Sequence, residues 1–72
     1  MDQTKIYTVV ELNYSHRDYN EPAYKRDYSD KSDAFKDAEA RTKTLTFGRV
    51  NIYEMQHGDL SSQKMLFERE RI

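Results

Sequence analysis

The chain has 72 residues, of which 36% are hydrophobic and 35% are charged, and it contains no cysteine. This length allows one small domain over 1–72, with ends expected to fray at about 1–3 and 70–72, and leaves no room for a second core. Without cysteine, disulfides and thiolate zinc sites are excluded. The 12 basic and 13 acidic side chains nearly cancel, unlike the charge imbalance of disordered chains.

No stretch of the sequence has the character of a targeting or membrane segment. The first apolar run, Val9–Val10, is far too short for a signal peptide and has no basic flank before it. A membrane-spanning helix needs about 20 apolar residues, which no segment approaches. We therefore expect a cytoplasmic protein, of a bacterial or an infected host cell, that does not act in a membrane.

Residues 4–14 predict a strand, because apolar and polar side chains alternate there and β-formers are abundant. Tyr7 and Val9 fall on the more polar face of this strand, which we expect to be partly covered. Residues 15–22 predict a polar loop, in which Pro22 favours extended geometry at the residue before it. The apolar face of the strand carries four side chains: Ile6, Val10, Leu12 and Tyr14.

Residues 23–28 predict a second, weaker strand, and a helix follows from residues 29–33 to about Lys43. Either Ser29 or Ser32 can cap the start of this helix, and the aspartates beside them suit the positive end of its dipole. The helix carries one apolar stripe, at Ala34, Phe35, Ala38 and Thr42.

The last part of the chain predicts a hairpin. Residues 49–56 alternate as a third strand, residues 57–62 supply turn residues, and residues 63–69 alternate as a fourth strand. The order β-β-α-β-β indicates an α+β fold: a four-stranded, mainly antiparallel sheet with one helix packed on one face. A single helix cannot cover both faces, so we expect the second face to be exposed or used for binding. We expect four side chains on that second face: Tyr7, Val9, Tyr53 and Met55.

The sequence assigns no catalytic, cofactor-binding or metal-binding residue, so we do not expect an enzyme. The only serine–histidine neighbours lie in predicted turns, around His16 and His57, where no third group and no dry pocket can hold a triad. The two histidines lie too far apart in the chain for metal-ligand spacing. Gly48 and Gly58 are isolated, which excludes a glycine-rich phosphate loop.

Positive charge is concentrated where the helix ends. Arg41, Lys43 and Arg49 are basic and residues 41–50 contain no acid, whereas residues 1–40 have an excess of acids. One interpretation is a phosphate-contacting patch for nucleic acid, with an affinity that falls as salt rises. The other is that these cations complement the negative end of the helix dipole and are otherwise solvated.

Tyrosines recur through the first loop and the second strand, with arginines beside them. Tyrosine offers a large contact area at a low entropy cost, which suits protein interfaces. Tyr14, Tyr24 and Tyr28 can equally fill a core that is poor in leucine, whereas Tyr19 lies in the middle of a polar loop. Our candidate protein-binding residues are Tyr14, Arg17, Tyr19, Tyr24 and Arg26.

In general character the chain resembles the small accessory proteins of bacteriophages and mobile elements. The resemblance lies in the short length, the strand Lys-Ile-Tyr-Thr-Val-Val at 5–10, the helix Lys-Ser-Asp-Ala-Phe-Lys-Asp-Ala-Glu-Ala at 31–40 and the closing hairpin. It implies a phage-type inhibitor or adaptor that blocks a host defence protein by occupying its surface.

Our leading hypothesis is therefore a non-enzymatic protein-binding module, which acts through the first hairpin or an exposed strand edge. Its partner would be a larger host protein or complex, and a homodimer is also compatible with the uncovered sheet face. The alternative is a small nucleic-acid-binding protein.

Overall fold

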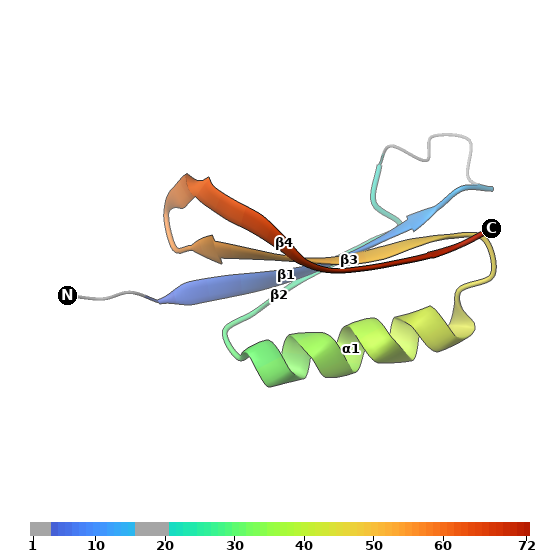
Figure 1. Ribbon diagram of the computed structural model, residues 1–72, viewed down its shortest axis with the longest axis horizontal. Helices are drawn as coiled ribbons and strands as arrows, with labels where there is room; N and C mark the ends of the chain where they lie inside the picture. The colour runs from blue at the N-terminus through green and yellow to red at the C-terminus, as the bar shows by residue number, and fades with distance from the viewer. Residues whose placement is uncertain (1–3, 16–20) are drawn as a thin grey trace.

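The computed structural model describes residues 4–15 and 21–72. It confirms the predicted α+β fold, in which four antiparallel strands form one sheet and a single helix lies along one side of it (Figure 1). We call the side of the sheet away from the helix the open face. The elements are β1 (Lys5–Asn13), β2 (Tyr24–Tyr28), α1 (Lys31–Thr44), β3 (Gly48–Gln56) and β4 (Asp59–Arg71).

The strand order in the sheet is β2-β1-β3-β4, so β1 and β3 are central while β2 and β4 are the two edges. β1 pairs with β3 along its whole length, from Lys5 opposite Gln56 to Asn13 opposite Gly48. In this register Val9 lies opposite Ile52, so both side chains point to the same face of the sheet.

The core lies between α1 and the two central strands. Val9, Val50 and Ile52 are fully buried, and they contact Ala34 and Ala38 on the helix. Small residues on α1 let the helix approach the β-branched side chains of the sheet closely. The tyrosines of β2 and Phe67 of β4 pack around the rim of this core, which explains how a chain so poor in leucine can fold.

The predicted assignment of the two faces of β1 is wrong. Tyr7 and Val9 face the helix, whereas Val10 lines a hollow on the open face, together with Tyr53 and Met55, which were placed there correctly. The alternation along β1 is ambiguous because both faces carry large side chains. The register with β3 decides between them, because it aligns Val9 with the buried Ile52.

The helix begins at Lys31, and its cap lies between the two serines that were predicted as alternatives. Asp30 is the N-cap, and its carboxylate accepts a hydrogen bond from the backbone N–H of Ser32 at 2.8 Å. Neither Ser29 nor Ser32 has this role. The helix ends at Thr44, one residue beyond the predicted end, and Arg41 and Lys43 lie in its last turn, where cations are favourable.

β4 is longer than predicted at both ends. It begins at Asp59 and continues to Arg71, so residues 70 and 71, which were expected to fray, lie inside the sheet. Two irregularities interrupt its pairing with β3, between Ile52 and Tyr53 and between Glu54 and Gln56. Residues 67–71, by contrast, pair with β3 without a shift in register.

The two glycines have different roles at the ends of β3. Gly58 lies in the turn to β4 with φ of 80°, a conformation that residues with a Cβ rarely adopt. Gly48 begins β3, where the backbone of Leu12 comes so close that a Cβ at this position would collide with the Leu12 carbonyl oxygen. Gly48 therefore permits the close approach of β1 and β3 at this end of the sheet.

Candidate functional site

A broad groove lies between the second half of α1 and the last residues of β4. The helix packs mainly over β3, β1 and β2, so the edge strand β4 extends past it and leaves a hollow of about 580 Å³. The helix side of this groove consists of Glu39, Thr42 and Lys43, and the strand side of Phe67 and residues 69–71.

The floor of the groove is aromatic. Phe67 is half-buried and meets Phe35 of α1 edge to face, with ring centroids 5.7 Å apart. The guanidinium of Arg69 lies 5.8 Å from the centroid of the Phe67 ring. The hydroxyl of Thr42 already donates to the carbonyl oxygen of Ala38 at 2.8 Å. The groove thus presents aromatic surface and charge to a ligand.

The cations of the groove have no acidic partner within the part of the chain that the structure describes. No carboxylate among residues 4–15 and 21–72 lies within ion-pair distance of Lys43, Arg69 or Arg71, and all three residues are exposed. Lys64, on the same face and further back along β4, does pair with Glu54 at 3.5 Å. Three cations without an ion-pair partner among the described residues therefore line this one groove.

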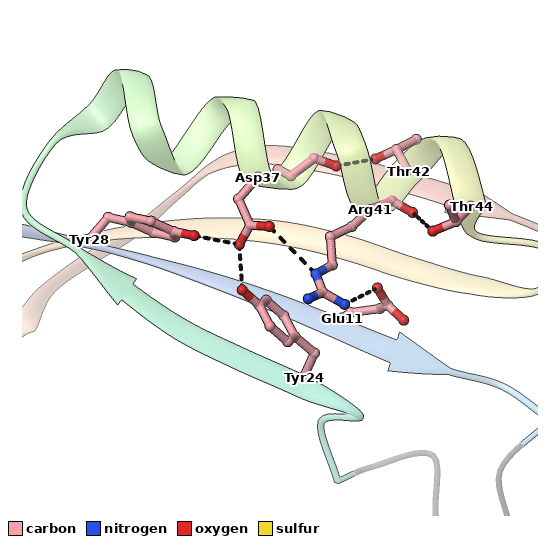
Figure 2. A network of polar contacts seen from close by, with 8 residues as sticks. Glu11, Tyr24, Tyr28, Asp37, Arg41, Thr42 and Thr44 are labelled. Atoms are coloured by element: carbon pink, nitrogen blue, oxygen red, sulfur yellow. Dashed lines mark hydrogen bonds and ion pairs between the residues drawn. The ribbon is translucent and has the colours of Figure 1, made fainter.

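A network of polar contacts joins β2 to α1 on the other side of the helix (Figure 2). The hydroxyls of Tyr24 and Tyr28 both donate to one carboxylate oxygen of Asp37, at 2.6 and 2.9 Å. The guanidinium of Arg41 lies 3.2 Å from the centroid of the Tyr24 ring and pairs with Asp37 and Glu11 at 3.5 and 3.7 Å. These five side chains therefore satisfy one another and fix the edge strand β2 to the helix.

The network also changes the titration of one tyrosine. Burial raises the pKa of Tyr28 to about 12, and the hydrogen bond to Asp37 adds to the effect because the carboxylate stabilises the protonated hydroxyl. The positive charge of Arg41 balances part of the negative charge of Asp37 and Glu11, with which it forms ion pairs.

Of the three candidate protein-binding residues that the structure describes, two share a face of the sheet and the third lies apart. Tyr24 and Arg26 are alternate residues of β2 on the side of the sheet that α1 covers. Arg41 covers the ring of Tyr24, and the guanidinium of the exposed Arg26 lies 5.1 Å from the Tyr28 ring centroid. Tyr14 lies just beyond β1 and donates a hydrogen bond to Glu70 at 2.5 Å. That hydrogen bond raises the pKa of Tyr14. Two further candidates, Arg17 and Tyr19, lie outside the described residues.

The three cations of the predicted basic patch lie on three different surfaces. Arg41 belongs to the network with β2, and Lys43 lines the groove beside β4. Arg49 lies on the open face, where its guanidinium is 3.7 Å from the carboxylate of Glu68. Of the three, Lys43 alone joins other unpaired cations, those of Arg69 and Arg71.

The open face has a smaller hollow of about 210 Å³ under the tip of the β3–β4 hairpin, which curls away from the helix (Figure 1). Val10, Tyr53 and Met55 form its apolar lining, and Leu60 at the tip is 76% exposed. No helix covers this face in the described part of the chain. It provides apolar surface without a cluster of charges.

Among residues 4–15 and 21–72, no group of three or more histidine, aspartate or glutamate side chains is arranged to hold a metal ion. No helix in this part is long and apolar enough to cross a membrane.

Comparison with known proteins finds no match: no family model, no curated protein and no solved structure is similar to this chain.

The sequence reasoning missed the groove because it treated the end of the chain as a frayed tail. The signal was present in the order Phe67-Glu68-Arg69-Glu70-Arg71, in which acidic and basic residues alternate. In a strand, this alternation places the cations on one face and the anions on the other. The alternation of charges predicts a charged face only if residues 67–71 are assigned to a strand, as they are in β4.

Proposed function

We propose that this protein is a non-enzymatic protein-binding module, which binds by adding an extended segment of its partner to the outer edge of β4. The observation that supports the proposal is the long edge strand itself. β4 spans 13 residues, and no strand among the described residues pairs with its outer side. Such an edge presents free backbone N–H and C=O groups, which a second chain can use to extend the sheet.

The stretch from Phe67 to Arg71 is the part of β4 best suited to this role. It pairs with residues 48–52 without a register shift, so its backbone is held straight by β3. The preceding residues are interrupted by the two irregularities, which twist an edge and disturb pairing. The groove lies beside this straight stretch and provides side-chain contacts next to the backbone contacts.

The partner in this proposal is a larger protein of the cytoplasm of a bacterial or infected host cell. Occupying its surface would make the module an inhibitor or adaptor, as expected for a phage-type protein directed against host defence. Binding through the first hairpin, with Arg17 and Tyr19, is the competing location within the same function.

Affinity capture tests this function. The immobilised protein is incubated with a bacterial lysate, with and without nuclease, and captured proteins are identified by mass spectrometry. We expect one protein to be enriched regardless of nuclease. Amide hydrogen exchange on the purified complex should then be slowed at residues 67–71, because backbone pairing protects these amides. Protection absent from β4 would refute the edge location, and loss of the complex in a variant with Arg17→Ala and Tyr19→Ala would assign it to the first hairpin.

Nucleic-acid binding is the alternative proposal, because the cations of this chain include unpaired ones such as Lys43. In that case Lys43 would contact phosphates together with Arg69 and Arg71 of the same groove, since Arg41 and Arg49 of the predicted patch lie on other surfaces. The affinity for a labelled oligonucleotide should then fall steeply with salt. Enrichment that disappears with nuclease would favour this alternative, whereas a flat salt titration would remove it.

A further inference from the structure

β4 separates its charges by face at the end that borders the groove. Arg69 and Arg71 lie opposite Val50 and Gly48 of β3, on the side of the sheet that α1 covers. The two glutamates of the same stretch lie opposite Asn51 and Arg49, on the open face. Phe67 continues the helix side, because it lies opposite the buried Ile52.

The negative charges of this stretch are already satisfied within the chain, but the positive ones are not. Glu68 pairs with Arg49 at 3.7 Å, and Glu70 accepts the hydroxyl hydrogen of Tyr14 at 2.5 Å. Arg69 and Arg71 have no such partner among the described residues, and the nearby Lys43 adds a third free cation to the same groove. The strand therefore offers unsatisfied charge of one sign and on one side.

We infer that the occupant of the β4 edge is an acidic extended segment of another protein, with acidic side chains at two alternate positions facing Arg69 and Arg71. This inference rests on the proposed function. Alternate residues of a strand lie about 7 Å apart on one face, which matches the spacing of the two arginines along β4. An apolar residue two positions further along would cover Phe67. The intervening side chains would face Glu68 and Glu70, where acids are unfavourable.

A second copy of this chain does not fit the edge in an antiparallel arrangement. Directly opposite residues of antiparallel strands share a face, so two copies of the stretch 67–71 would set arginine against arginine or glutamate against glutamate. Like charges in these positions are destabilising. The charge pattern of β4 therefore favours a segment from a different protein over self-association through this edge.

Nucleic acid also fits the groove less well than an acidic peptide. Three cations neutralise few phosphates, whereas two of them suffice for the two acidic side chains of the proposed segment. A peptide, by contrast, can use both the free backbone groups of β4 and the cations beside them.

Selection from a random peptide library tests the inference without knowledge of the natural partner. Displayed 12-residue peptides, a length of about 40 Å when extended, are selected on the immobilised protein at low and at physiological salt. The enriched sequences are then measured against the wild type, an R69Q/R71Q variant and a matched K25Q/K31Q variant. The control removes two exposed cations that do not line the groove, one on β2 and one at the start of α1. Circular dichroism establishes that each variant is folded.

We expect the enriched peptides to carry acidic residues at positions i and i+2. Their affinity should fall about tenfold in R69Q/R71Q and change less than twofold in K25Q/K31Q. Peptides without this acidic pattern, or with equal affinity for R69Q/R71Q, would overturn the inference while leaving peptide binding intact. Failure to enrich any peptide would contradict both the inference and binding at the edge. Displacement of the peptides by a single-stranded oligonucleotide at physiological salt would overturn the inference and indicate that the groove binds nucleic acid.

Discussion

The two edge strands of the sheet both carry aromatic and cationic side chains, but these side chains have different contacts on the two strands. β2 has five residues with charged side chains in its middle, and its two tyrosines are tied to Asp37 of the helix. β4 has 13 residues, and its last two cations contact no carboxylate of the described chain. An aromatic side chain near an edge thus indicates binding only where the chain itself leaves it unsatisfied. Lys25 and Arg26 of β2 also have no carboxylate at ion-pair distance among the described residues, but unlike the cations of β4 they do not line the groove. By this criterion the tyrosines of β2 contribute to stability, and the end of β4 is the candidate for recognition.

Among the variants that test this contrast, Asp37→Ala is expected to have the largest effect on stability. The substitution removes the acceptor of two tyrosine hydroxyls and one partner of Arg41, so we expect it to lower the free energy of unfolding by about 2 kcal/mol. Urea denaturation followed by circular dichroism measures the effect. Glu39→Ala is the matched control on the groove side of the same helix, and it should cost less than about 0.5 kcal/mol. Equal costs would mean that the network does not hold β2.

A smaller effect is expected for Arg41→Lys. Lysine keeps the charge but loses the planar group that lies over the Tyr24 ring, so the free energy of unfolding should fall by about 1 kcal/mol. Because the Arg41 side chain is 35% exposed, its ion pairs account for little of this loss. Lys43→Ala, two residues away and facing the groove, should leave the urea midpoint unchanged. A neutral Arg41→Lys variant would show that the stacking contributes nothing.

The pH dependence of stability gives a third test. Tyr28 has a folded-state pKa of about 12 against an ordinary value of 10.0, so the folded state holds this proton more tightly than the unfolded state. The resulting stabilisation is complete below pH 10 and is lost as the pH rises towards 12. Urea midpoints measured across this range should fall more steeply for the wild type than for Tyr28→Phe. Parallel curves for the two proteins would contradict the role of Tyr28 in the network.

The smallest effect on stability is expected at β4. The R69Q/R71Q variant removes cations that have no ion-pair partner among the described residues, so its free energy of unfolding should differ from the wild type by less than about 0.5 kcal/mol. Thermal denaturation is sufficient for this comparison. A loss as large as that of Asp37→Ala would show that these arginines are structural and would remove the contrast between the two edges.

The fold could be predicted from the sequence because each element carries a local signal. The alternation in residues 4–14, the small residues of the helix and the turn at Gly58 fix the order of the elements. The choice of face in β1 could not be predicted, because Val9 and Val10 are equally apolar. Only the long-range pairing of Val9 with Ile52 determines which of them is buried.

The candidate site was harder to predict than the fold. The tyrosines stood out in the sequence, but Asp37 and Arg41 are distant from Tyr24 in the chain, so their contacts are invisible without the structure. At the end of β4 the sequence pattern was visible but was interpreted as a solvated tail. The pairing of Gly48 with Arg71 shows that these alternating charges belong to the sheet.

The strand order has a consequence for how the chain reaches its native state. β3 and β4 are joined by a two-residue turn, so this hairpin can form in about 1–10 μs from local contacts alone. β1 must instead pair with β3 across almost half of the chain, with β2 and α1 in between, which makes loop closure the slow step. Folding is therefore expected to be limited by the docking of the first strand, and substitutions at the β1–β3 contact should slow it more than those in the hairpin turn.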